Sequence, residues 1–282
     1  MGLEKDVWCQ YYQAHAIAKK EVRKAEKAGQ DSSPMQLKDM LENRKIIGNV
    51  DLGTIEIPVD SIVGTAAFDE NDLYSPGFKP IASVNSPYAS EWCQLYLDYL
   101  TDKGWDNPIR CIEFLGRFYV QDGKKRVSVL KANGAMVTNA IVTRVMPAPS
   151  QDKEIVNYYK FLENYEKTGL YQVALTEPES FDKLQSAFGY STNRVWDESD
   201  RFHFLFNLIP VAYALQNAFH GNINVTPADA LVALLKNYTV ADLRKMQPWD
   251  MSKVLRSSWV DLYKMMDPDF KIASASVIKQ AS

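Results

Sequence analysis

The sequence predicts an α+β fold: a small mixed-sheet domain that is preceded by N-terminal helices and followed by an all-α domain. Strand-like and helix-like segments alternate between residues 55 and 146, as in small α/β domains. Apolar residues at helical spacing dominate on either side of that stretch. Residues 146–150 are uncharged and contain two prolines, which marks a boundary. We therefore expect a helical segment over 1–48, the α/β domain over 49–147 and a helical domain over 151–282.

The N-terminal segment is expected to form two helices, over residues 4–28 and 35–44. In the first, Val7, Tyr11 and Ala18 trace one apolar face, and the later residues are nearly all charged or alanine. Acidic and basic residues are mixed there, so a solvated helix is favoured over a face that binds nucleic acid.

The α/β domain is expected to open with a strand over residues 55–63, where apolar and polar residues alternate. Pro58 places this strand at a sheet edge or at a bend. Residues 64–80 read as a long loop. Long loops in compact domains are often functional, so this one would either cover a binding site or be an insertion without chemistry.

Residues 117–131 hold the strongest functional signal in the chain. They read as a short apolar strand, an Asp-Gly turn and a helix whose first turn carries three cations. Gly123 can adopt a positive φ, and the helix behind it presents free N–H groups and the positive end of its dipole. Lys124, Lys125 and Arg126 would converge there on an anion, so the pattern predicts a phosphate site.

The same residues permit a plainer interpretation. Asp-Gly is also a common hairpin signal, and three cations at a turn are often simply solvated. Asp122 is best interpreted as structural, with its side chain capping the helix N-terminus and fixing the turn.

Five further features follow one another in a fixed order between residues 81 and 145. They are Asn85-Ser86-Pro87 before a helix over 91–103, Gly104 with Pro108-Ile109 before a strand, Gly123 with Arg126, Asn133-Gly134 at a helix end, and a closing strand over 139–145. This order resembles the ParB N-terminal-like (ParB/sulfiredoxin) domain, whose signature is a Gly-x-x-Arg turn. The resemblance implies a nucleotide-binding or phosphate-binding cleft at that turn.

In that family the cleft serves a CTP-dependent clamp on DNA, phosphoryl transfer in sulfiredoxin, free-serine kinases and some proteins labelled nucleases. The resemblance thus implies CTP or ATP as ligand, with Mg²⁺. Tyr88 and Asn85 would lie near the bound nucleotide, with the Tyr88 ring close to the base. Sulfiredoxin chemistry is not expected, because Gly123, Lys124 and Lys125 occupy the positions of its catalytic cysteine.

Glu56 and Asp60 are the candidate catalytic residues. They lie on the first predicted strand, which in the ParB/sulfiredoxin fold runs near the cleft. The serine-kinase relatives use an acidic residue near that strand as a base, so one of the two carboxylates would position a hydroxyl or hold Mg²⁺. The alternative is that both side chains face solvent on an edge strand.

Composition excludes several classes of function. A net charge of −3 opposes general attraction to nucleic acid, so DNA is a candidate partner only through a local basic patch. The three cysteines and three histidines lack ligand spacing, and no metal site is expected. No run of about 18 apolar residues occurs, so we expect no membrane association and a cytoplasmic location.

In the helical domain, residues 202–215 form a nearly all-apolar helix that is expected to be central and kinked at Pro210. His203 is interpreted as a core or interface histidine. Residues 239–258 have the length of a helix-turn-helix but lack its turn glycine, so a plain packing domain is favoured.

Two classes of function remain. In the first, the chain is a nucleotide-dependent switch or interaction module, with a protein or a second copy of itself as partner. In the second, the same Gly-x-x-Arg cleft is the site of a small-molecule phosphotransferase or a nuclease. Binding is favoured over catalysis, and the sequence does not decide whether a nucleotide is turned over.

Overall fold

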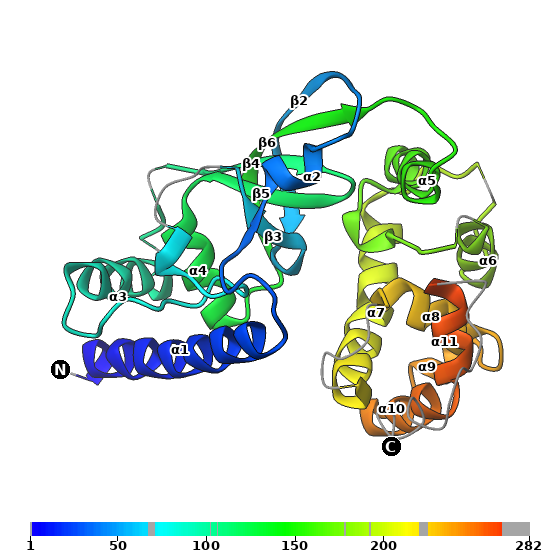
Figure 1. The fold of residues 1–282 in the computed structure, drawn as a ribbon. Coiled ribbons are helices and arrows are strands. Elements are labelled where there is room, and N and C mark those ends of the chain that lie inside the picture. Colours follow the sequence, from blue (N-terminus) through cyan, green and yellow to red (C-terminus); the bar gives the residue numbers. More distant parts are fainter. Residues whose placement is uncertain are drawn as a thin grey trace. The chain divides into compact units, whose positions relative to one another are not determined.

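The structure, a computed structural model, confirms the α+β class and consists of two compact units, Met1–Pro149 and Ser150–Ser282. It describes residues 2–66, 71–101, 103–105, 107–177, 179–191, 193–219 and 225–266. Parts of the expected 64–80 loop and the end of the expected helical domain therefore lie outside the described residues. The units divide within the proline-containing segment 146–150 (Figure 1).

The first unit is built around a mixed sheet. Its elements are α1 (Gly2–Lys27), β1 (Met35–Gln36), α2 (Leu37–Leu41), β2 (Ile46–Pro58), the 3-10 helix η1 (Val59–Ser61), β3 (Ile62–Thr65), the 3-10 helix η2 (Asn71–Leu73), α3 (Pro87–Leu100), β4 (Ile109–Phe114), β5 (Arg117–Asp122), α4 (Lys124–Asn133) and β6 (Val137–Pro147). The strand order is β1-β3-β5-β4-β6-β2. Pairs β1–β3, β3–β5 and β4–β6 are parallel, and β4–β5 and β2–β6 are antiparallel.

The predicted strand over 55–63 is in fact two strands. The end of β2 pairs with β6, the chain then turns through η1, and β3 pairs with β5. Pro58 is the last residue of β2, where its missing N–H and fixed φ suit a bend. The predicted helix over 35–44 is also shorter, because Met35 and Gln36 pair with β3 before the helical turn begins.

Helices α1, α3 and α4 gather on one side of the sheet (Figure 1). Trp92 of α3 is fully buried, and its indole N–H donates to the Ser128 hydroxyl of α4 at 2.9 Å. Tyr11 of α1 packs edge-on against the same indole, with 5.3 Å between ring centroids. Helix α3 is thus the layer that connects α1 to α4. On α2, Leu37 packs in a separate cluster that contains Tyr119 of β5.

The second unit is helical. It contains α5 (Lys153–Thr168), the 3-10 helix η3 (Tyr171–Val173), α6 (Ser180–Ala187), α7 (Glu198–Phe219), α8 (Pro227–Leu235), α9 (Val240–Leu243), α10 (Pro248–Ser257) and α11 (Trp259–Met266). Helix α8 is buried almost throughout, and α7, α8, α10 and α11 contribute to one core cluster. Among the described helices of the whole chain, none has the length and apolar composition of a membrane span.

Helix α7 differs from the all-round buried helix that its composition suggests. Phe204, Leu208 and Val211 are buried, whereas the opposite face carries exposed aromatic and aliphatic side chains. Pro210 lies inside α7. Only one face of α7 therefore contributes to the core, and the expected central position holds for that face alone.

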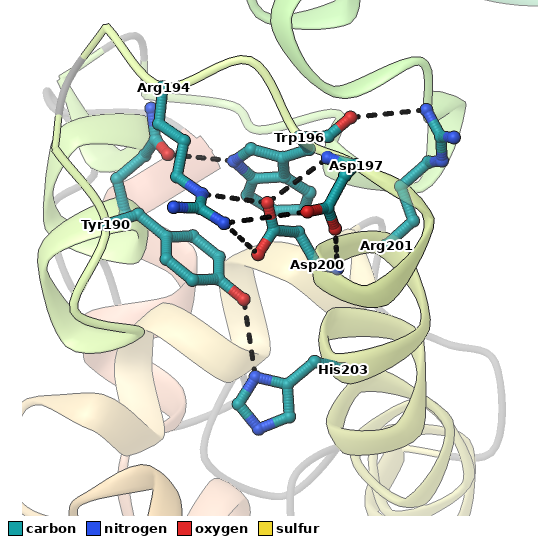
Figure 2. A network of polar contacts seen from close by, with 8 residues as sticks. Tyr190, Arg194, Trp196, Asp197, Asp200, Arg201 and His203 are labelled. Carbon is teal, nitrogen blue, oxygen red and sulfur yellow. Dashed lines mark hydrogen bonds and ion pairs between the residues drawn. The ribbon is translucent and has the colours of Figure 1, made fainter.

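A polar network holds the segment before α7 against the helix start (Figure 2). Arg194 donates to both carboxylate oxygens of Asp200, at 2.8 and 2.9 Å, and this hydrogen bonding lowers the pKa of Asp200. The backbone N–H groups of Asp197 and Asp200 each donate to the other residue's carboxylate. The Tyr190 hydroxyl lies 3.3 Å from Nδ1 of His203. These contacts stabilise the helix N-terminus and give His203 a structural partner.

Candidate phosphate-binding site

The turn between β5 and α4 has the geometry that the sequence predicts. Gly123 is the N-cap of α4 and adopts φ 100° and ψ 25°, in the left-handed region. Its own lack of a side chain leaves the cap position without a side-chain hydrogen bond. Gly123 therefore supplies no capping side chain to the first N–H groups of α4, which lie at the turn. Lys124, Lys125 and Arg126 form the first turn of the helix.

The Arg126 guanidinium lies directly over Gly123. A Cβ atom on Gly123 would come within 2.9 Å of Nη2 and 3.0 Å of Nε, so only glycine permits this contact. The Arg126 side chain is 11% exposed, and Nη2 donates to Oδ2 of Asp122 at 2.9 Å. Its Nη1 is buried and has no hydrogen-bond partner in the described part of the chain. A buried donor without a partner is costly, which is why it suggests a ligand.

The prediction that Asp122 caps the helix is wrong, whereas its predicted structural role at the turn agrees with an ion pair to Arg126. The N-cap position belongs to Gly123, which leaves Asp122 one residue too early to reach the helix N–H groups. Its carboxylate instead pairs with Arg126 four residues later. The Asp122 carboxylate thus accepts a hydrogen bond from Nη2, a donor that a bound phosphate would also use.

Lys125 connects the site to α3. Its Nζ forms an ion pair with Glu91 and lies 5.2 Å from the centroid of the Tyr88 ring. Lys124 is largely buried. Two of the three cations of the turn are therefore paired with carboxylates, Lys125 with Glu91 and Arg126 with Asp122.

A pocket of about 280 Å³ opens at this turn. The described residues that line it are Leu95, Gln121, Asp122, Gly123, Lys124, Lys125 and Arg126. Sites for drug-sized ligands usually start near 300 Å³, so the pocket has the size for a phosphate chain rather than for a whole nucleotide. Sequence reasoning missed Leu95, which α3 brings in from a distant part of the chain, and Gln121, whose only signal is its position next to the Asp-Gly turn.

Asn85 and Tyr88 are not among the described residues that line the pocket. Asn85 is exposed in the turn before α3. Tyr88 is 8% exposed, and burial together with the neighbouring Tyr74 raises the pKa of its hydroxyl. In this arrangement little of the Tyr88 ring is open for stacking on a base. Its connection to the turn runs through Lys125.

Glu56 and Asp60 are not among the described residues that line the pocket. Glu56 is exposed on β2, at the edge of the sheet, and β4 and β6 lie between β2 and β5. Asp60 lies in η1 and interacts electrostatically with Lys131, near the C-terminal end of α4. Their catalytic role stays a prediction.

Asp60 belongs to a cluster of charges that sequence reasoning missed. Burial lowers the pKa of Lys131 to about 8 and also lowers the pKa of Lys79, while Asp60 and Glu21 act in the opposite direction. The Lys79 ammonium donates to the carbonyl oxygen of Lys131. Glu21 of α1 accepts hydrogen bonds from the Ser75 hydroxyl and from a backbone N–H of the same loop. The residues of this charge cluster are distant in sequence, so no local sequence pattern predicts that they lie together.

The described residues contain no group of three or more histidine, cysteine or acidic side chains that could hold a metal ion. The three cysteines are free. Burial raises the pKa of Cys93 to about 11 and that of Cys111 to about 12, so neither thiol is an activated nucleophile.

No protein-family model matches this chain, and neither does any curated protein. The likeness to the ParB/sulfiredoxin domain therefore rests on the ordered motifs alone and stays a prediction.

Proposed function

We propose that this protein binds a phosphate-bearing ligand, a nucleoside triphosphate such as CTP or ATP, at the turn between β5 and α4. We further propose that it acts as a ParB/sulfiredoxin-like switch or interaction module. The observation that carries the proposal is the Arg126 guanidinium, which is buried over Gly123 at the N-terminus of α4 and has an unpartnered Nη1 among the described residues. Helix N–H groups and a guanidinium together match the oxygens of a phosphate.

When a phosphate binds, Arg126 and Lys125 would exchange their carboxylate partners for phosphate oxygens, at a small cost in free energy. Asp122 pairs with Arg126 and Glu91 pairs with Lys125, and both carboxylate side chains are more than half exposed. Ion pairs of this kind contribute roughly 0–1 kcal/mol each. Phosphate oxygens would replace the carboxylates with charge-assisted hydrogen bonds in a less solvated pocket, so the exchange favours the bound state.

Mg²⁺ would enter with the nucleotide rather than alone. In nucleotide sites it is usually held by phosphate oxygens and one or two carboxylates. Asp122 is the carboxylate in the described pocket lining, and phosphate binding would release it from Arg126.

Binding is favoured over transfer chemistry. A phosphotransferase or nuclease needs a base near the reacting phosphate, and Glu56 and Asp60 are not among the described residues of the pocket lining. DNA stays a candidate partner that the net charge of −3 disfavours.

A thermal-shift screen tests the proposal, with ATP, ADP, CTP, GTP and inorganic phosphate, each with and without Mg²⁺. A ligand at 100 times its dissociation constant should stabilise the folded state by about 2.7 kcal/mol. Arg126→Ala should abolish that shift, because it removes the buried guanidinium.

The matched control is Lys20→Ala, which removes the same charge from an exposed position on α1 and should keep the full shift. Circular dichroism of each variant establishes that it is folded. The proposal is wrong if the wild-type protein responds to none of these ligands, or if folded Arg126→Ala responds as the wild type does.

A further inference from the structure

The exposed face of α7 carries large apolar side chains that the proposed function does not use. Phe202 is 71% exposed, Phe206 56%, Ile209 44% and Tyr213 58%. We call these four residues the α7 stripe. Single exposed apolar residues are ordinary, but four on one face of one helix form a contiguous patch of the kind that marks an interaction site.

The spacing of the α7 stripe is that of a helix–helix seam. Its members are separated by four, three and four residues, the pattern of core positions in a coiled coil. At a rise of 1.5 Å per residue the stripe spans roughly 16 Å. The Phe202 and Phe206 rings stack with their centroids 6.3 Å apart, which makes a continuous aromatic surface. A second helix of the same period would fit along it.

The charge of the surrounding surface restricts what can cover the α7 stripe. Between Phe202 and Phe219 the sequence contains no acidic residue, lysine or arginine. The positions that flank the stripe are His203, Leu205, Pro210 and Ala212. The helix itself therefore offers no formal charge to a charged partner. The cations beside it, Arg244 and Arg256, are hydrogen-bonded to Asn207 and to the carbonyl groups of Asn217 and Ala218. Two copies of the helix segment 202–219 bring no like charges of their own together.

We propose that the α7 stripe is a homodimer interface in which the α7 helices of two copies pack antiparallel about a two-fold axis. With the axis between positions 206 and 209, Phe206 of one copy faces Ile209 of the second copy, and Phe202 faces Tyr213 of the second copy. The larger Phe206 ring then meets a smaller aliphatic side chain, and the helix dipoles oppose each other. A two-fold axis uses the same patch twice, so one stripe completes the interface.

The area available predicts a dimer of modest affinity. From the exposed fractions and the usual size of such side chains, the α7 stripe offers roughly 400 Å² per copy. A stable interface buries about 800 Å² per partner. Trp249, 61% exposed at the start of α10, is a further exposed aromatic residue of the same compact unit. The dimer should therefore form in a concentration-dependent way.

Sedimentation velocity of the full chain over a wide range of concentrations tests the interface. The wild type should shift from monomer to dimer, and Phe206→Glu should stay monomeric because it would bury two charges at the axis. The control is Val156→Glu, the same kind of change at an exposed apolar position of α5, which should dimerise as the wild type does.

Phe206 and Val156 are both exposed, so circular dichroism should find both variants folded. A wild type that is monomeric at every concentration overturns the proposal. Dimerisation of Phe206→Glu with the wild-type constant also overturns it.

Disulfide trapping tests the orientation. In a Cys9→Ser background, a mixture of Phe206→Cys and Ile209→Cys chains should form mixed disulfides faster than either variant forms disulfides with itself. Cys93 and Cys111 are buried and do not compete. Faster self-pairing of both variants would mean parallel helices, and faster self-pairing of one alone would place the axis at that position. Either result, or no trapping at either position, would contradict the proposed axis.

Discussion

Gly123 and Arg126 depend on each other in two separate ways. The backbone at Gly123 has φ 100°, which strains any residue with a Cβ atom. The Arg126 guanidinium also fills the space that a Cβ atom would need. Gly134, at the other end of the same helix, has φ 69° but nothing within 4 Å of its Cβ position. The two glycines therefore separate backbone strain from the loss of the arginine contact.

Alanine at each glycine should give different results. Gly134→Ala should destabilise the protein by about 1 kcal/mol through backbone strain, and it should leave phosphate binding unchanged. Gly123→Ala should cost about 2 kcal/mol and should abolish binding, because the new methyl group displaces Arg126. Chemical denaturation measures the free energy of unfolding, and a titration with the ligand found by thermal shift measures binding. Equal affinity in the two variants would contradict the role assigned to Gly123.

At the scale of elements, α4 carries a different electrostatic environment at each end. Its first turn holds three cations beside an open pocket, whereas Lys131 in its last turn is half-buried and lies 5.9 Å from the Phe78 ring. Burial lowers the pKa of Lys131 to about 8, from an ordinary value of 10.5. The charged form is thus destabilised in the folded state, and Asp60 offsets only part of that cost.

The pH dependence of stability should reveal Lys131. Below pH 8 the lysine is charged in both states and its burial cost is fully present. Between pH 8 and 10.5 the folded state loses the proton first, so the unfolded state binds more protons and stability rises with pH. The free energy of unfolding of the wild type, relative to Lys131→Met, should therefore increase across this window, on the order of 2 kcal/mol.

Denaturation of both proteins at several pH values measures this difference. Tyrosines and cysteines also titrate in the window, but their contributions are common to both proteins and cancel. For Lys20→Met, at an exposed position of α1, the difference in free energy of unfolding from the wild type should not change with pH. A difference that is also independent of pH for Lys131→Met would mean that Lys131 is not desolvated.

Elements whose signals are local could be predicted, and elements that depend on distant pairing could not. The strand, turn and helix over 117–133 were located because the apolar run, the turn glycine and the helix end lie in one segment. Around Pro58 the alternation of apolar and polar residues continues through the bend, so two strands with different partners looked like one. For the same reason the sequence located the cations of the site but not Glu91 and Leu95, which the packing of α3 on α4 brings there.

On the scale of the whole molecule, the two proposed properties belong to different compact units. The phosphate site lies within Met1–Pro149 and the α7 stripe within Ser150–Ser282. Each site can therefore be removed without touching the other. Arg126→Ala should leave dimerisation unchanged in the absence of ligand, and Phe206→Glu should leave the phosphate pocket intact.

A nucleotide-dependent switch that acts through self-association requires that the two units influence each other. If the bound nucleotide favours one association state, it must change the dimerisation constant, and dimerisation must change nucleotide affinity by the same factor. Coupling of this kind is typically about 5-fold to 150-fold. Sedimentation with and without saturating nucleotide should show a shift of that size in the wild type, and none in Arg126→Ala. An unchanged dimerisation constant, with binding and dimerisation each established separately, would mean that the nucleotide does not act through self-association and that the switch must work on another partner.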